Sequence, residues 1–172
     1  MWIDLRQLDP SAAYKLLTSA ITPRPIAWVS SLSVDGVVNL APFSFFQMIT
    51  DQPPTLMIST QHKADGSRKD TSLNIEATRD FVVNLVPHAL ANEMNISAAA
   101  VPADESEFDL ANLTPIPSVK IKPMRVKESP IHFECELVHH YFLEGHQQGG
   151  ACVLIGKIVM MHYDEKMLLD NY

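Results

Sequence analysis

Cysteine is scarce in this sequence, and the two that occur do not form the pattern of a metal or redox site. Cys135 and Cys152 both lie in apolar stretches, with no CxxC pair and no histidine at ligand spacing beside them. Cysteines of this kind are usually reduced core residues, and disulfides are rare in the cytoplasm. We expect two free thiols in a cytoplasmic protein. The alternative is a disulfide, which would require their strands to face one another.

The short motifs of several enzyme classes are also missing. There is no GxGxxG after a strand-like segment and no GxxxxGK[ST], so the sequence does not support a Rossmann or P-loop phosphate site. There is likewise no GxSxG and no HExxH. Of the seven histidines, the adjacent pair His139 and His140 would point to opposite faces of a strand and could not chelate together. We expect no metal site.

Basic residues are fewer than acidic ones, which gives a formal net charge of -7 at pH 7. This argues against nucleic acid and against anionic membranes as main partners, so an anion site would have to be a local basic island. No apolar run approaches the ~18 residues of a membrane span, and the N-terminus lacks the pattern of a signal peptide. A length of 172 residues suits one domain over residues 1–172.

The apolar pattern predicts many strands and few helices. Strand succeeds strand without regular alternation with helices, which favours an antiparallel barrel with peripheral helices over a doubly wound sheet. Five prolines predict an irregular excursion over residues 101–130, and the apolar character of residues 151–163 predicts a strand covered on both faces. The predicted strands are 25–33, 37–40, 45–50, 55–60, 80–86, 131–143 and 151–163, and the predicted helices are 10–20 (capped by Asp9), 67–79 and 88–100.

The start of the second predicted helix carries charge of the unexpected sign. Ser67 and Asp70 have the spacing of a capping box, whereas Arg68 and Lys69 lie at the positive end of the helix dipole. Free backbone N–H groups, a helix dipole and two cations together would hold a phosphate. Solvated surface side chains are the alternative.

Two further segments combine apolar residues with a few polar ones. In PRPIAWVSS, Ser30 and Ser31 end an apolar strand, so one hydroxyl must turn inward and be satisfied by a ligand oxygen or a backbone carbonyl. In NLAPFSFF, Asn39 and Ser44 are polar points among three phenylalanines. A flat heteroaromatic ligand needs such apolar walls with a few hydrogen-bonding groups, although an ordinary core segment has the same composition.

Four segments together resemble the flavin reductase-like family of FMN-binding split-barrel proteins, in particular its flavoredoxin-like branch. They are PRPIAWVSSLSVDGVVNLAPFSFF, PPTLMIST, RKDTSLNI and FVVNLV. The resemblance extends over nearly the whole chain and implies a Greek-key split β-barrel that binds FMN at or near a homodimer interface. Relatives of this type usually continue beyond the last strand, whereas this sequence ends at DEKMLLDNY. The FMN contacts implied by the resemblance are Ser30, Ser31, Asn39, Ala41, Pro42, Ser44, Ser59, Thr60, Arg68, Lys69, Asp70 and Thr71.

The function implied by the resemblance is NAD(P)H-dependent reduction of free flavin or another small acceptor. Flavin itself carries the hydride chemistry, so we expect no catalytic side chain. The alternative is a flavoredoxin-like electron carrier that holds FMN without NAD(P)H turnover.

Overall fold

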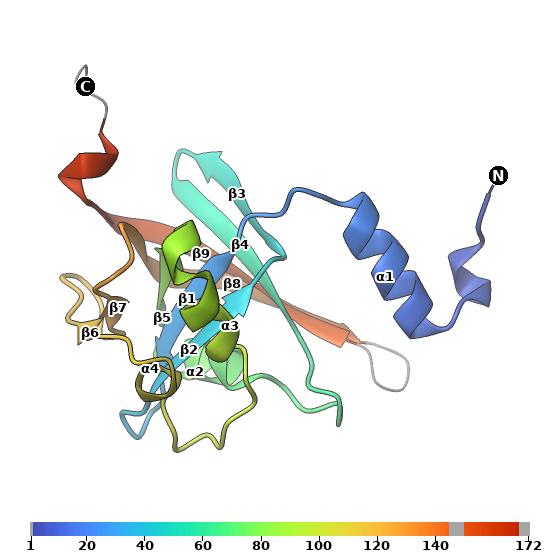
Figure 1. The fold of residues 1–172 in the computed structure, drawn as a ribbon, viewed down its shortest axis with the longest axis horizontal. Helices are drawn as coiled ribbons and strands as arrows, with labels where there is room; N and C mark the ends of the chain where they lie inside the picture. Colours follow the sequence, from blue (N-terminus) through green and yellow to red (C-terminus); the bar gives the residue numbers. More distant parts are fainter. Residues whose placement is uncertain (1, 145–149, 169–172) are drawn as a thin grey trace.

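The computed structural model describes residues 2–144 and 150–168, which fold around one curled antiparallel sheet (Figure 1). The sheet has seven strands in the order β2-β1-β5-β8-β9-β4-β3. This confirms the predicted mainly β architecture. The strands are β1 (Ala27–Leu32), β2 (Val38–Phe43), β3 (Phe46–Asp51), β4 (Pro54–Gln61), β5 (Asp80–Leu85), β8 (Ile131–Glu144) and β9 (Gly150–Tyr163), and a separate pair consists of β6 (Pro115–Ile116) and β7 (Arg125–Val126).

The two edge strands of the sheet, β2 and β3, are consecutive in the chain. Only Ser44 and Phe45 connect them, and the backbone N–H of Ser59 in β4 donates to the carbonyl of Phe45 at 2.8 Å. A sheet whose first and last strands are joined by so short a connection must curl around its own apolar face. The result is a barrel whose two edges meet beside residues 44 and 45.

Apolar side chains form one cluster inside the barrel and a second cluster outside it. Successive side chains of β1 point to opposite faces of the sheet, so the strand contributes to both clusters. Ala27 and Val29 belong to the inner cluster and Trp28 to the outer one. The outer cluster is completed by residues of the 101–130 excursion, among them Phe108 and Val126. Trp28 is fully buried there, and its indole Nε1–H donates to the Ser97 hydroxyl at 2.8 Å. Strand β1 is therefore buried on both faces.

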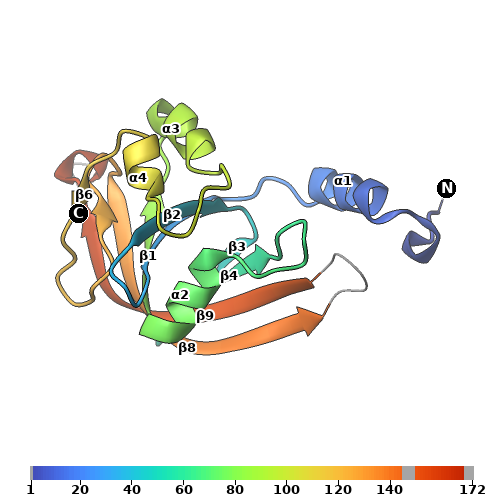
Figure 2. The same cartoon turned by 90° about the horizontal axis from the view of Figure 1, so that it is seen from below.

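The described residues form four α-helices, where the sequence predicted three, and two of the predicted helices differ in extent. Helix α1 (Pro10–Ala20) is capped by Asp9 as predicted, and it stands clear of the barrel with no buried residue (Figures 1 and 2). Helix α2 (Asp70–Thr78) begins three residues later than predicted. The third predicted helix is a 3-10 turn (His88–Leu90) followed by α3 (Ala91–Ile96), while α4 (Glu107–Leu110) lies within the excursion predicted to be irregular.

Strand β9 corrects one expectation, because it is not covered on both faces. Cys152, Leu154 and Gly156 are buried, while the residues between them are partly exposed. Cys152 pairs with Phe142 and Cys135 with Ile158, so the cysteines do not face one another, and both are free and buried. Free thiols in the core agree with the prediction.

One end of the β8–β9 ribbon carries a buried carboxylate. Glu134 is fully buried and accepts backbone N–H groups from Val119 at 2.8 Å and Lys120 at 2.7 Å. Its Oε1 also lies 2.6 Å from Nε2 of His162. Burial alone would raise the pKa of Glu134, but these hydrogen bonds together hold it below the ordinary value. These hydrogen bonds connect the 101–130 excursion to strand β8 of the sheet.

No helix among the described residues is both long enough and apolar enough to cross a membrane.

Candidate functional site

A cavity of about 290 Å³ lies where β2, β4 and the start of α2 meet. This volume is near the lower end of the range for small-molecule sites. Helix α1 contributes Tyr14 to the lining, and the segment after α3 contributes residues 97–101. Eight of the twelve predicted contact residues line the cavity: Asn39, Ala41, Pro42, Ser44, Ser59, Lys69, Asp70 and Thr71.

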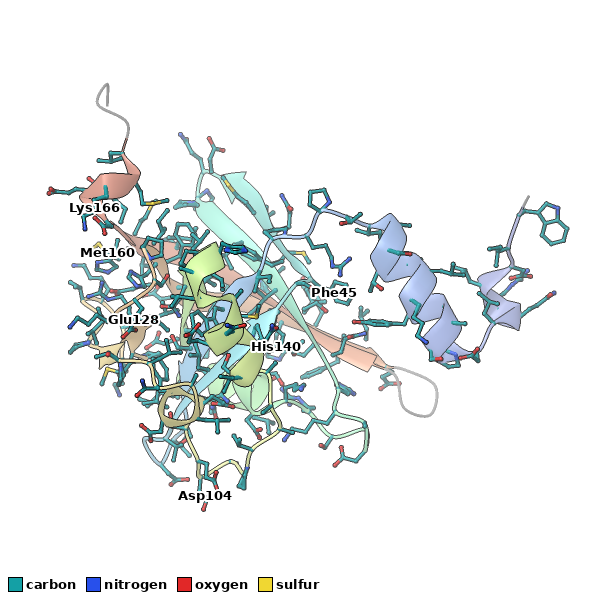
Figure 3. All side chains as sticks on the ribbon, viewed as in Figure 1. Phe45, Asp104, Glu128, His140, Met160 and Lys166 are labelled. Atoms are coloured by element: carbon teal, nitrogen blue, oxygen red, sulfur yellow. The ribbon has the colours of Figure 1, made fainter. Side chains whose placement is uncertain are left out.

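The NLAPFSFF segment supplies the apolar wall of this cavity. Ala41, Pro42, Phe43 and Phe45 line it, and Phe45 lies on the side of the barrel toward α1 (Figure 3). The segment is not purely core, because it curves from β2 into the connection to β3 and most of its residues line the cavity. The arrangement combines apolar walls with hydroxyl and amide groups at the edge, as a flat heteroaromatic ligand requires.

The N-terminus of α2 also lines the cavity, and it is organised differently from the predicted capping box. Lys69 is the N-cap residue and makes no side-chain capping hydrogen bond. Ser67 instead donates its hydroxyl to Asp65 at 2.6 Å in the preceding turn, so the predicted cap is wrong. An N-cap residue without an acceptor side chain leaves the first N–H groups of the helix without a side-chain partner.

The two predicted cations at this helix start have different surroundings. Arg68 forms an ion pair with Glu76, and its guanidinium lies 4.6 Å from the ring centroid of Phe142, so it does not line the cavity. Lys69 lines the cavity and forms no ion pair with a residue in the described part of the chain. Lys63 lines it as well and pairs with Asp70 at 2.9 Å. The local positive charge available to an anion therefore comes from Lys69, with Lys63 beside it.

The predicted strand hydroxyls are satisfied within the protein and do not reach this cavity. Ser30 donates to the carbonyl of Met124 at 2.5 Å, and Thr60 donates to that of Cys152 at 3.3 Å. Ser31 donates to Asn39 at 3.2 Å. Both serines are fully buried because β1 is covered on both faces, whereas the sequence required only one of them to turn inward.

A buried carboxylate behind Asn39 is a site residue that the sequence did not indicate. Glu107 is 5% exposed and lines the cavity. Its Oε1 accepts from Nδ2 of Asn39, and its Oε2 accepts from the backbone N–H of Leu40, both at 2.8 Å. The pKa of Glu107 is raised above its ordinary value, because burial outweighs the hydrogen bonds from Leu40 and Asn39, which act in the opposite direction. Nothing in the sequence links Glu107 to Asn39, because they are 68 positions apart and Glu107 belongs to the excursion.

Arg24 connects the cavity to α1. Its guanidinium donates to the carbonyls of Thr18 and Ile21 at the C-terminal end of the helix, and its Nε donates to the Ser44 hydroxyl at 3.3 Å. A cation at this position satisfies free carbonyls and complements the helix dipole. Arg24 therefore fixes the base of α1, whose Tyr14 lines the cavity, to the wall of the same cavity.

An antiparallel barrel with an apolar slot and a cationic helix start at one rim is typical of proteins that bind a flat cofactor bearing a phosphate. Comparison with known proteins specifies the class. The model of the flavin reductase like domain matches residues 19–171, and the chain belongs to this family.

Solved structures of other proteins share the fold over almost the whole chain. Nitrilotriacetate monooxygenase component B from Bacillus cereus is 40% identical with a TM-score of 0.93, over 99% of this chain and 84% of that one. The 2-nitrobenzoate 2-nitroreductase NbaA of Pseudomonas fluorescens is 30% identical with a TM-score of 0.84, over 98% and 79%. A protein from Shewanella frigidimarina NCIMB 400, described as a flavin reductase with a split barrel domain, is 21% identical with a TM-score of 0.82, over 99% and 84%, and shows the fold alone. The expected split barrel is confirmed.

Proposed function

We propose that the chain binds FMN in the cavity between β2 and α2 and oxidises NADH or NADPH to reduce free flavin or another small acceptor. The main observation behind the proposal is that the apolar wall of the cavity and the N-terminus of α2, whose N-cap residue is a lysine, line the same cavity. One cavity thus offers apolar walls for a ring system and an anion site for a phosphate.

The residues present fit this cofactor. Ala41, Pro42 and Phe43 would lie against the isoalloxazine ring, while Lys69 and the N–H groups at the start of α2 would hold the phosphate. A bound flavin accepts a hydride equivalent from a reduced nicotinamide and supplies electrons to an acceptor. The protein contributes position and a site from which water is excluded. The name of the Bacillus cereus relative, a component of a monooxygenase, favours an acceptor outside this chain.

We further propose that the protein is a cytoplasmic homodimer. Helix α1, its C-cap residue and the C-terminal end of β8 present apolar side chains to solvent. Among them are Leu17, Ile21, Tyr141 and Leu143, each more than two fifths exposed. Apolar surface of this extent is typical of an interface. Sedimentation at micromolar concentration should give the mass of two chains, and a monomer at every concentration would contradict this assignment.

The test of the proposed function is a titration of the purified protein with FMN, followed by NADH or NADPH. We expect FMN absorbance to shift on binding and nicotinamide absorbance to fall when free flavin is added as acceptor. A protein that neither carries nor takes up FMN would refute the proposal.

The same assay separates the alternative of a flavoredoxin-like electron carrier. Such a protein would retain FMN through gel filtration but oxidise NADH and NADPH negligibly, with or without free flavin. A bound flavin that no donor reduces would instead indicate a binding module without redox turnover.

A further inference from the structure

Asn39 is held by three side chains and presents a defined polarity to the cavity. Its Oδ1 accepts from the hydroxyl of Thr71 at 2.8 Å and from that of Ser31 at 3.2 Å. Its Nδ2 donates to Glu107 at 2.8 Å. Asn74 donates to the Ser31 oxygen at 3.3 Å, so the proton of that hydroxyl is free for Asn39.

Of these three partners, only Glu107 determines which way the amide points. A serine or threonine hydroxyl can either donate or accept, so Ser31 and Thr71 would tolerate both orientations of the amide. The carboxylate of Glu107 accepts an N–H group on each of its oxygens, so it acts as an acceptor and faces the NH₂ group of Asn39. Glu107 is itself fixed in place because its second oxygen accepts the backbone N–H of Leu40.

Within the described part of the chain, this arrangement leaves one polar group of the Asn39 side chain without a partner. The two hydroxyls occupy both lone-pair positions of Oδ1, and Glu107 takes one of the two Nδ2 protons. Asn39 lines the cavity, so the group that it can offer a ligand is the remaining N–H. A flavin has acceptor atoms along the polar edge of its ring.

We propose that Glu107 is a positioning residue that makes Asn39 a hydrogen-bond donor to the ring edge of the bound flavin. The inference rests on the proposed function and extends it, because it assigns a role to a residue of the excursion that does not itself need to touch the cofactor. The buried network stabilises the protein, but its distinguishing effect is on the cofactor.

Exchanging the two side chains separates these two effects. In the double variant Asn39→Asp with Glu107→Gln, the carboxylate introduced at position 39 would accept from both hydroxyls and from the amide introduced at position 107. The oxygen of that amide would accept from the backbone N–H of Leu40. All four protein hydrogen bonds and the total charge are kept, while the group facing the cavity changes from donor to acceptor. Each single variant places two donors or two acceptors against one another and should lower the melting temperature.

We expect the exchange variant to melt within a few degrees of the wild type and to bind FMN and riboflavin about tenfold or more weakly. Its bound flavin should also have a lower reduction potential, because an acceptor replaces a donor beside a ring that gains negative charge. Glu105→Gln is the matched control: it removes an exposed carboxylate two positions from Glu107 and should change neither affinity nor potential.

Three outcomes would overturn the inference. Wild-type affinity and potential in the exchange variant would show that Glu107 is structural only. Loss of FMN binding with riboflavin binding intact would place Asn39 at the phosphate. A melting temperature as low as that of the single variants would show that the assigned polarity is wrong. The proposed function fails separately, if the wild-type protein itself binds no flavin.

Discussion

Lys69→Ala is expected to weaken FMN binding while leaving riboflavin binding almost unchanged, because riboflavin lacks the phosphate. Lys69 caps α2, lines the cavity and has no acidic partner in the described part of the structure. A hydrogen bond to a charged group contributes about 1.5–3 kcal/mol, and the lower value suits a lysine that is only half-buried. The expected loss is therefore about tenfold in FMN affinity.

The assay is a fluorescence titration of each variant with FMN and with riboflavin at low and high salt. The preference of the wild type for FMN should fall as salt rises, and that of Lys69→Ala should depend less on salt. Lys127→Ala removes an exposed lysine elsewhere and should leave both affinities unchanged. Arg68→Ala should leave the ratio of the two affinities unchanged, because Arg68 is paired with Glu76. Equal weakening of both ligands by Lys69→Ala would refute the phosphate assignment.

Three other predictions concern the stability and reactivity of the fold. The pKa of Glu134 is lowered below 4.5, so its carboxylate stabilises the fold above that pH and this contribution is lost as pH falls through the folded-state pKa. In urea titrations, Glu134→Gln should be less stable near neutral pH and lose stability less steeply below about pH 4.5; a slope equal to that of the wild type would contradict this. Gly156→Ala would place its Cβ 2.7 Å from Cε1 of the buried Phe81 and should cost about 1–3 kcal/mol in unfolding free energy, so an unchanged urea midpoint would count against the packing. Burial raises the pKa of both thiols, that of Cys152 to about 11, so a thiol reagent at about pH 8 should label Cys135 and Cys152 only in denaturant, and rapid labelling of the native protein would disprove their burial.

The sheet could be predicted from the sequence because its information is local. Strands alternate with period two and turns carry their own residues, so the seven main strands were located with errors of a few residues at the ends. Coverage of a strand is not local information. It depends on what the rest of the chain places over each face, and the prediction accordingly failed for β9 and required only one buried serine in β1.

For the candidate site as well, the sequence predicted the features that depend on neighbouring residues and missed those that depend on distant ones. The NLAPFSFF segment and Lys69 could be assigned because apolar walls and a charge at a helix start are visible in a few consecutive residues. The partner of Arg68 could not be assigned, because Arg68 precedes the helix and reaches Glu76 eight positions further on. Glu107 was missed because its partner is far away in sequence and the prolines around it give no periodic pattern.

The hydrogen bond between Trp28 and Ser97 makes the fluorescence of Trp28 a reporter of the cavity. Ser97 begins the segment that lines one side of the cavity, and the indole that donates a hydrogen bond to it is fully buried. The other tryptophan, Trp2, is 87% exposed, so Trp2→Phe would leave emission from Trp28 alone. Flavin absorbs at wavelengths where tryptophan emits, so loading of the cavity can be followed by quenching of this single residue, without labels and independently of the redox state of any acceptor.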